Sequence, residues 1–473
     1  MCSEFQPEEK ICCRLQEIAR FFGIPRQSRI PTLDRGDRLG KQILIENRRR
    51  YDLSMSVTPL SSTILSFEDA RQVVEQHAAA IQPPTTEKID LLSAAGRVLA
   101  EPIFADRDFP PFPRSARDGY AVRAADLASL PARLKLIGEI RAGAKQEDIP
   151  SNIAPGQAAS IMTGAPVPAG ADAVVMVEYT TRRDDVVEVA RSVSPGDNVV
   201  PCGAEARQGS RLLDRGLRLN DAAIALAASV GKAQLSVYKR PRVALLATGD
   251  ELVDIAASPG PTQIRNSNTY SLAVQARESG GDSILLPIAT DERESLRRLL
   301  EDGLRSDLLL ITGGVSVGQY DLVEQVLSGL GAEFFFTGAE IQPGRPIVFG
   351  RCGAGAPARE APTYFFGLPG NPVSTMVTFA LFARPMIEAL AGQVPCKLTF
   401  LHARLKSEIR VKPGLRRFLP AIISGEFENA EVERIAWQGS GDIAATALAN
   451  CYVVIPPDRE CISPGEWIAV LPR

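Results

Sequence analysis

The stretch LITGGVSVGQYD (residues 310–321) decides how the rest of the chain is interpreted. The apolar run 308–311 is typical of a buried strand, and it leads into a segment with three glycines, the hydroxyl side chains of Thr312 and Ser316, and one carboxylate. In an open parallel sheet, ligands bind beyond the carboxyl ends of the strands, where such loops emerge. The stretch therefore predicts a ligand-binding loop in an α/β domain.

The periodicity around this loop predicts the sheet itself. Strand-like apolar runs occupy 243–247, 283–288 and 308–311, and helical patterns at 271–279 and 292–304 separate them. Strands that alternate with helices form βαβ units, which give a parallel sheet with helices on both faces.

The segments on either side of this domain have other patterns. Prolines, glycines and short β-branched runs recur from 101 to 208, as expected for strands joined by turns. After Gly392, alternating segments predict a small β-domain at the end of the chain. Ser66 and the apolar spacing that follows predict a capped helix, and we expect residues 1–62 to be a disordered extension.

Composition limits the class of function. The chain has 473 residues, enough for several domains, and a formal net charge of −3, so nucleic acid is not an expected partner. We find no apolar run of the ~18 residues that a membrane span needs, so we expect no membrane association and a cytoplasmic protein. The eight cysteines are scattered, and they are expected to be reduced. His77 and His402 are the only histidines, which excludes a histidine-rich metal centre.

The opening loop has the groups that an oxyanion requires. Its glycines allow backbone N–H groups to approach an anion, and its hydroxyl side chains can donate further hydrogen bonds. A carboxylate beside an oxyanion site indicates a bridging cation, most often Mg²⁺. A tight turn in which Asp321 caps the next helix explains this loop equally well. The candidate residues are Thr312, Gly313, Gly314, Ser316, Gly318 and Asp321.

A second loop, FGLPGNPVS (366–374), precedes the helical run 375–390. Its amides and Ser374 would lie at a helix N-terminus, where anions are favoured. The alternative is a proline-rich turn with Asn371 as the helix cap. Two such loops in one sheet favour a ligand that contains phosphate.

Acidic residues follow two of the predicted strands. Asp250 and Glu251 lie in TGDEL (248–252), and Asp291 and Glu292 follow the next strand. Like charges gathered at one edge are costly unless a cation or proton is present, so such clusters often mark metal sites. Taken singly, each carboxylate is more typical of a helix cap. In the β-rich region, Asp118-Gly119 is typical of a hairpin turn.

Together these stretches resemble the MoeA family, the molybdopterin molybdenumtransferases, which are similar to the E domain of gephyrin and of its plant counterpart. The resemblance runs from about Leu65 to the C-terminus in unbroken order. It is carried by SARDGYAV (115–122), TGAPVPAGADAVV (163–175), GAE (203–205), TGDEL (248–252), TGGVSVGQYD (312–321), QPGRP (342–346), LPGNPVS (368–374) and WQGSG (437–441).

The resemblance implies an α/β plus β multidomain fold and a homodimer. It implies a MogA-like α/β domain with a parallel-type sheet, a β-rich insertion domain, a linker domain and a C-terminal β-barrel. The expected boundaries are an N-terminal extension at 1–62, a helix and first linker segment at 65–104, the β-rich domain at 105–210, a second linker segment at 211–240, the α/β domain at 241–394 and the barrel at 395–473.

The implied activity is transfer of molybdate into adenylylated molybdopterin with release of AMP, assisted by Mg²⁺. A MogA-like adenylyltransferase and apo-molybdoenzymes are implied as protein partners. The cleft would lie between the α/β domain of one subunit and the β-rich domain of the other. The implied catalytic residues are Asp118, Asp250, Glu251 and Asp321, and the metal ligands are Asp250, Glu251, Asp291, Glu292 and Asp321. The implied binding residues are Thr163, Glu205, Thr312, Gly313, Gly314, Ser316, Gly318, Gln342, Arg345, Pro369, Gly370, Asn371, Ser374 and Ser440.

The sequence departs from the family pattern at several charged positions. Gln342 and Gly338 stand where family members commonly have basic residues, and Pro420 replaces an arginine. Arg345, Arg416 and Arg417 are the candidates to compensate. Ala206 replaces an acidic residue, and Glu292 stands where aspartate is usual.

Two other functions are compatible with these patterns. A non-catalytic pterin-nucleotide-binding or scaffold protein, as in gephyrin, would keep the fold without turnover, and a tungstate-using variant would keep the reaction with another oxyanion. CinA-like proteins share the α/β domain but lack both β-domains, which argues against that assignment.

Overall fold

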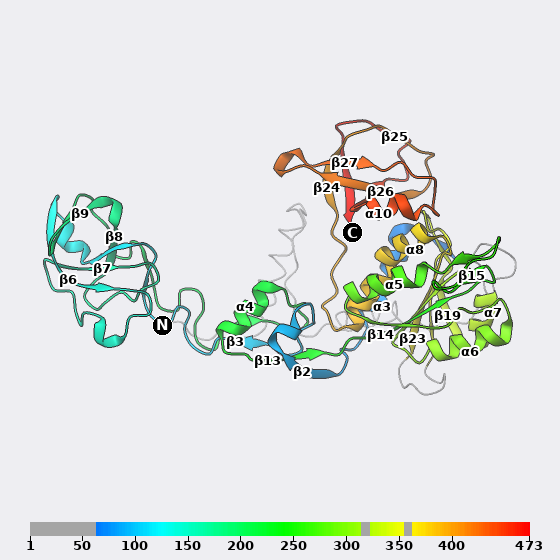
Figure 1. Cartoon of the computed structure of the whole chain (residues 1–473), viewed down its shortest axis with the longest axis horizontal. Coiled ribbons are helices and arrows are strands. Elements are labelled where there is room, and N and C mark those ends of the chain that lie inside the picture. The colour runs from blue at the N-terminus through cyan, green and yellow to red at the C-terminus, as the bar shows by residue number, and fades with distance from the viewer. Residues whose placement is uncertain (1–62, 314–321, 354–361) are drawn as a thin grey trace, which may run out of the picture. The chain divides into compact units, whose positions relative to one another are not determined.

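A computed structural model describes residues 63–313, 322–353 and 362–473. Its central α/β domain contains a six-stranded sheet in the order β17-β14-β18-β23-β22-β19 (Figure 1). The predicted parallel arrangement is confirmed for the first four strands, whereas β22 and β19 run antiparallel. The strands are β14 (Arg242–Ala247), β17 (Asp282–Leu285), β18 (Leu308–Thr312), β19 (Ala332–Phe336), β22 (Val348–Cys352) and β23 (Thr363–Leu368).

Helices cover both faces of this sheet because its strands are apolar on both sides (Figure 1). In β18, Leu308 and Leu310 pack in one cluster with α3 and α5, whereas Leu309 and Ile311 pack in the other with α6 and α7. Successive side chains of a strand point to opposite faces, which produces this division. The helices are α3 (Phe67–Ala79), α5 (Asn268–Glu278), α6 (Arg293–Gly303) and α7 (Leu322–Gly329).

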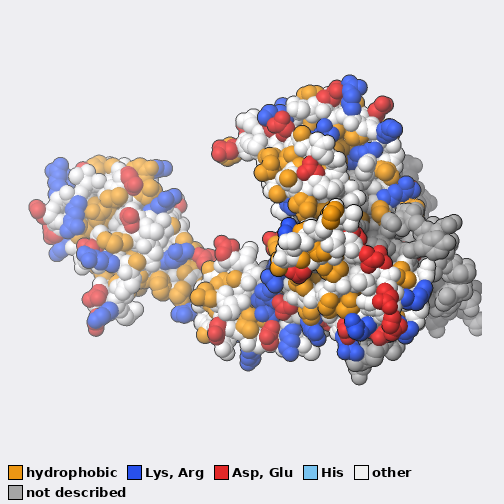
Figure 2. All heavy atoms as spheres, turned by 45° about the vertical axis from the view of Figure 1, so that its right-hand side comes forward, with side chains coloured by type: hydrophobic (Ala, Val, Ile, Leu, Met, Phe, Trp, Pro, Cys, Tyr) orange, Lys and Arg blue, Asp and Glu red, His pale blue; other side chains and the backbone are white. Residues whose placement is uncertain are grey.

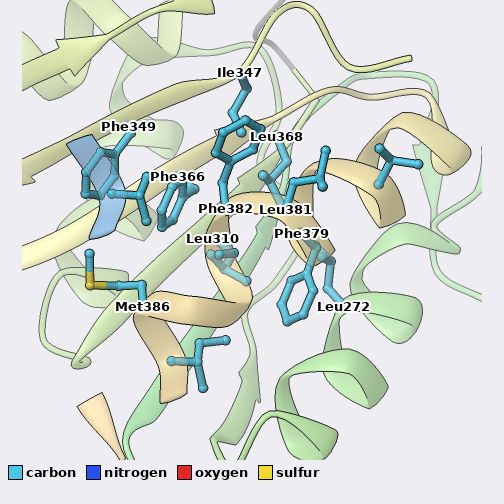
Figure 3. Packing of buried hydrophobic residues seen from close by; sticks show 14 of the residues in the cluster. Leu272, Leu310, Ile347, Phe349, Phe366, Leu368, Phe379, Leu381, Phe382 and Met386 are labelled. Carbon is cyan, nitrogen blue, oxygen red and sulfur yellow. The ribbon is translucent and has the colours of Figure 1, made fainter. Parts of the chain in front are cut away.

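The helix after β23 is the most deeply buried. It runs as α8 (Pro372–Thr378), a π-helical segment (Phe379–Ala383) and α9 (Arg384–Leu390). Among the described residues, Pro372–Leu390 is the one helix long and apolar enough to span a membrane, which corrects our statement that no apolar run reaches that length. Because 83% of its apolar window is buried, it is a core helix. Figure 3 shows Phe379, Leu381, Phe382 and Met386 packed among side chains of the sheet.

The predicted cap of the first helix is confirmed. The Ser66 hydroxyl accepts a hydrogen bond from the Asp69 amide at 3.1 Å and donates one to the Asp69 carboxylate at 2.7 Å. Helix α3 joins the core of the α/β domain, where the Phe67 ring meets the Phe382 ring edge-on at 6.2 Å. The preceding strand β1 (Ile64–Leu65) pairs in parallel with β20 (Gly338–Ala339).

The β-rich region has its own six-stranded sheet, in the order β8-β5-β7-β6-β10-β9. Asp118-Gly119 is not the hairpin turn that its pattern favours, because Gly119 begins β5 (Gly119–Val122) and pairs with two neighbouring strands. A Cβ at Gly119 would lie 1.9 Å from the Val175 carbonyl oxygen, so the glycine permits a close strand contact. The other strands are β6 (Ala132–Ile140), β7 (Gln157–Ile161), β8 (Ala173–Met176), β9 (Thr180–Arg183) and β10 (Val186–Val189); β4 (Arg114–Ser115) pairs with β11 (Val199–Val200).

Two segments distant in sequence form one further unit. Strand β2 (Thr86–Asp90) pairs with β13 (Gln234–Tyr238), and β3 (Ile103–Phe104) pairs with β12 (Arg211–Leu213). A separate apolar core that includes Leu99, Ala223 of α4 (Asp221–Ser229) and Val237 joins them.

The C-terminal region is a closed barrel of five strands, β26-β27-β24-β30-β28, because β28 also pairs with β26. The short strand β21 (Ile341–Gln342) extends from the α/β domain and pairs with β26. Phe418 and Tyr452 of the barrel belong to the α/β core cluster, so the barrel packs on that domain. The barrel elements are β24 (Leu401–Leu405), β26 (Arg416–Ser424), β27 (Glu431–Arg434), α10 (Ile443–Leu448), β28 (Cys451–Ile455) and β30 (Trp467–Pro472), with β25 (Ile409–Arg410) and β29 (Cys461–Ile462) as an added pair.

Charged side chains of both signs are interspersed over the face shown in Figure 2. This distribution accords with the formal net charge of −3 and gives no extended basic surface on that face.

Candidate functional site

A cleft of about 630 Å³ lies at the carboxyl ends of β14, β18 and β23, where sheets of this kind bind ligands. Loops from three strand ends form it, together with the segment before α5 and the start of α10. Its lining consists of Thr248, Glu251, Leu252, Ile264, Arg265, Asn266, Ser267, Asn268, Thr312, Gly313, Pro346, Pro369, Gly370, Asn371, Pro372, Gly441 and Ile443.

The floor of the cleft is bare backbone at Gly313. This residue has φ +90°, and a Cβ there would lie 2.3 Å from the Thr248 carbonyl oxygen. Thr248 is 2% exposed, and its hydroxyl has no hydrogen-bond partner in the described part of the chain. Buried polar groups are nearly always paired, so an orphaned hydroxyl in a cleft wall indicates a group that a ligand satisfies.

The Thr312 hydroxyl, by contrast, is fully engaged within the protein. It donates to the Pro369 carbonyl at 3.1 Å and accepts from the side-chain amide of Asn268 at 2.9 Å. Asn268 also donates to the Gly370 carbonyl at 2.7 Å. Thr312 therefore holds the loops together, and its hydrogen is already used.

The helix N-terminus beside Gly370 is partly occupied by the C-terminal region. The Val373 amide donates to the Ser440 carbonyl at 3.0 Å, so one amide of the predicted anion site is taken. Asn371 is the residue before α8 but makes no side-chain cap, and Ser374 is buried at 3% exposure. Ser440 thus meets the loop through its backbone.

The acidic loops come together at the edge of the cleft. The Asp291 amide donates to the Asp250 carboxylate at 3.1 Å, and Glu251 lines the cleft itself. Burial, and next the negative charges of Asp250 and Glu251, raise the pKa of Asp291. Glu292 precedes α6 without a side-chain cap.

These carboxylates fit Mg²⁺ by donor chemistry, because hard cations prefer oxygen ligands. Within 63–313, 322–353 and 362–473, no group of three His, Cys, Asp or Glu side chains is placed to bind a metal ion by itself. Mg²⁺ usually binds through one or two carboxylates together with water and substrate phosphate, so a protein cage is not required. The predicted residues Gly314, Ser316, Gly318 and Asp321 lie outside the described residues.

The predicted residues of the β-rich region form two polar contacts of their own. The Asp118 carboxylate accepts from the amide of Thr163 at 2.7 Å and from its hydroxyl at 2.9 Å, and these bonds hold the pKa of Asp118 below its ordinary value. Glu205 forms an ion pair of 2.8 Å with Arg114. None of these residues lines the cleft of the same chain.

Each of the three neutral substitutions has a defined place in the structure. The Arg417 guanidinium donates to the Gln342 side-chain oxygen at 2.8 Å, so a cation lies beside the position that is commonly basic. Gly338 faces Ile64 across a strand pair, where a Cβ would lie 3.0 Å from the Ile64 side chain. Pro420 is a buried strand residue opposite Tyr452.

Sequence reasoning missed several cleft residues. Thr248 is the first residue of the motif TGDEL, but nothing in the sequence assigns it a role of its own. Arg265 and Asn268 belong to the segment QIRNSN (263–268), for which the sequence predicts no function. A polar run directly before a predicted helix was the available signal for the second group. Arg345 is exposed and does not line the cleft.

The fold and the cleft define a multidomain α/β protein with a candidate ligand site at the carboxyl ends of its parallel strands. Three family models match: the MoeA N-terminal region (domain I and II) at 65–231, a probable molybdopterin binding domain at 244–389 and the MoeA C-terminal region (domain IV) at 402–472. The chain therefore belongs to the MoeA family.

Named relatives and solved structures agree with this assignment. The chain is 36% identical to a molybdopterin molybdenumtransferase from Nostoc sp., over 82% of this chain and 88% of the relative, and 33% identical to one from Bacillus subtilis, over 82% and 89%. Two structures of a molybdopterin biosynthesis MoeA protein from Pyrococcus horikoshii superpose with TM-scores of 0.63 and 0.68. Their identities are 32% and 26%, and they cover 86% and 87% of this chain and 99% and 100% of their own.

Proposed function

We propose that this chain is a molybdopterin molybdenumtransferase, which inserts molybdate into adenylylated molybdopterin and releases AMP in the last step of molybdenum cofactor biosynthesis. The observation that carries the proposal is the cleft, which joins bare backbone at Gly313, a Thr248 hydroxyl without a partner among the described residues, and an acidic edge. An anionic nucleotide and a divalent cation together match these groups. The named relatives support the same reaction.

Each part of the cleft has a chemical role in this proposal. The backbone at Gly313 and Gly370 and the Thr248 hydroxyl would bind phosphate oxygens, and preorganised donors of this kind stabilise developing negative charge. Asp250, Glu251 and Asp291, with Asp321, would hold Mg²⁺. When bound, that ion neutralises charge on the pyrophosphate during its hydrolysis.

Positive charge would come from arginines rather than from the usual basic positions. Arg265 lines the cleft, and the Arg417 guanidinium lies beside Gln342. Burial lowers the pKa of Arg417, but a guanidinium stays charged at neutral pH. Arg416 is less suited, because it pairs with Glu68 on α3.

We further propose that the active enzyme is a cytoplasmic homodimer of subunits divided at the predicted domain boundaries. Asp118, Thr163 and Glu205 would then complete the cleft of the other subunit, since they do not line their own. The five cysteines in the described part of the chain are all free, which supports a reducing compartment. A MogA-like adenylyltransferase and apo-molybdoenzymes are the expected partners before and after this step.

Product analysis tests the reaction directly. The purified protein is incubated with adenylylated molybdopterin and either molybdate or tungstate, and the pterin product is examined by mass spectrometry. We expect molybdenum on the dithiolene together with free AMP. A tungsten product alone would assign the other oxyanion, and a bound but unchanged nucleotide would indicate the non-catalytic alternative.

A further inference from the structure

Two strand ends that line the cleft approach each other at a pair of glycines. A Cβ at Gly370 would lie 3.5 Å from the Gly313 Cα, so the ends of β18 and β23 nearly touch there. Backbone hydrogen bonds join neighbouring strands, and between β18 and β23 this pairing ends at Thr312 and Leu368. Beyond that pair, side-chain hydrogen bonds join the two strand ends in the described part of the chain.

Asn268 supplies this connection. It is the first residue of α5 and is half-buried in the cleft wall. One N–H of its amide donates to the Thr312 hydroxyl at the end of β18, and its nitrogen also donates to the Gly370 carbonyl after β23. The Thr312 hydroxyl in turn donates a hydrogen bond to the Pro369 carbonyl.

This connection also determines which groups remain available to a ligand. Both donors of the Asn268 amide are directed at the protein, so the side-chain nitrogen has no donor left for phosphate. The Thr312 hydroxyl is likewise used. The backbone at the two glycines, whose spacing Asn268 maintains, would then bind phosphate together with the Thr248 hydroxyl.

We infer that Asn268 is a positioning residue for the molybdenumtransferase reaction, which sets the spacing of the Gly313 and Gly370 loops and thereby the affinity for the nucleotide phosphate. The inference rests on the proposed function for its ligand but not for its geometry. Loss of the amide should loosen both loops and weaken nucleotide binding while the fold persists, because the rest of each strand keeps its ladder.

The test compares Asn268→Ala with a matched variant, Asn450→Ala. Asn450 also makes two side-chain hydrogen bonds, to the amide and carbonyl of Ile423 in the barrel, but does not line the cleft. Hydrogen exchange is measured on peptides that cover 308–313 and 366–374 without ligand. AMP affinity is measured by calorimetry, and KM and kcat are measured with adenylylated molybdopterin.

We expect faster exchange in both peptides, and AMP affinity about tenfold weaker with a matching rise in KM, for Asn268→Ala only. Thr312→Val should reproduce part of the effect, because it removes one end of the connection. Unchanged exchange in Asn268→Ala would overturn the inference, as would equal losses of affinity in both asparagine variants. If the wild-type chain fails to bind AMP, the proposed function fails, and the exchange comparison still decides the role of Asn268.

Discussion

Among single residues, the hydroxyl groups without a hydrogen-bond partner in the described part of the chain indicate where a ligand can bind. Thr312 was predicted as an anion-binding hydroxyl, yet its hydrogen bonds are internal, whereas the neighbouring Thr248 hydroxyl has no partner among the described residues. Sequence cannot distinguish two threonines at strand ends, because the difference lies in which carbonyls and amides reach them. The unpaired hydroxyl is the group that a ligand would satisfy.

Thr248→Val tests this assignment through opposite effects on binding and stability. Removing an unsatisfied buried hydroxyl should leave the free energy of unfolding unchanged or raise it by up to about 1 kcal/mol. AMP affinity should fall several-fold, because a ligand hydrogen bond is lost. Thr363→Val is the control: its hydroxyl donates to the Leu304 carbonyl at 2.7 Å in the core, so we expect lower stability and unchanged affinity. A Thr248→Val protein that melts earlier and binds AMP normally would contradict the assignment.

Gly313→Ala tests the bare floor of the cleft. The new Cβ would lie 2.3 Å from the Thr248 carbonyl at φ +90°, so the loop must shift, at a cost of more than about 1 kcal/mol. We expect AMP binding, measured by calorimetry, to be largely lost. Gly329→Ala is the matched control, since a Cβ there meets nothing within 4 Å, and it should bind AMP as the wild type does.

At the scale of elements, the alternation of apolar runs predicted the parallel strands and their helices. The predicted strand at 283–288 is shorter in the structure, where β17 is Asp282–Leu285 and lies at the edge of the sheet. The antiparallel pair β19 and β22 was not predicted, since direction depends on connections rather than on apolar pattern. Asn268 was missed for a similar reason: its two partners are 44 and 102 residues away.

Helix α3 packs on the α/β sheet partly through the ring of His77, a side chain that can take up a proton. His77 stacks on Phe335 with ring centroids 3.9 Å apart, and its Nδ1 lies 3.4 Å from the Tyr364 hydroxyl. Burial and then the nearby Arg351 charge lower the pKa of His77, while Glu333 acts in the opposite direction. The folded state therefore binds this proton more weakly than the unfolded state does, and folding is opposed by protonation.

Acid should thus destabilise the protein partly through His77. At pH values above the ordinary histidine value of 6.5 the group is neutral in both states and contributes nothing; as pH falls below 6.5, the unfolded chain takes up a proton that the folded chain resists. We expect the drop in Tm between about pH 8 and about pH 5.5 to be smaller in His77→Gln than in the wild type. His402→Gln is the control, because His402 is exposed on the barrel. Equal drops in all three proteins would refute this role.

For the molecule as a whole, three family models match along most of the chain, but the two groups of predicted site residues do not share one cleft within the chain. Part of the α/β group lines it, namely Glu251, Thr312, Gly313, Pro369, Gly370 and Asn371. Asp118, Thr163 and Glu205 instead make contacts within the β-rich region. The sequence predicts both groups, and in the proposed homodimer a second subunit would bring them into one cleft.

Complementation between subunits tests the proposed homodimer. Asp118→Asn and Asp250→Asn should each be inactive, and refolding or co-expressing the two together should restore about a quarter of the wild-type activity. That fraction follows because half of the dimers are mixed and each mixed dimer has one site with both aspartates intact. Activity that stays at zero after subunit exchange, verified by mass spectrometry, would place both aspartates in the same subunit's site.

The most direct test of the account is AMP release from adenylylated molybdopterin by the purified chain, measured with and without molybdate across a Mg²⁺ titration. We predict release that requires both the oxyanion and Mg²⁺, because the acidic edge needs a cation and the cleft presents donors to anions. AMP release that does not depend on molybdate or Mg²⁺ would contradict this prediction. Binding of the nucleotide without any AMP release would also contradict it.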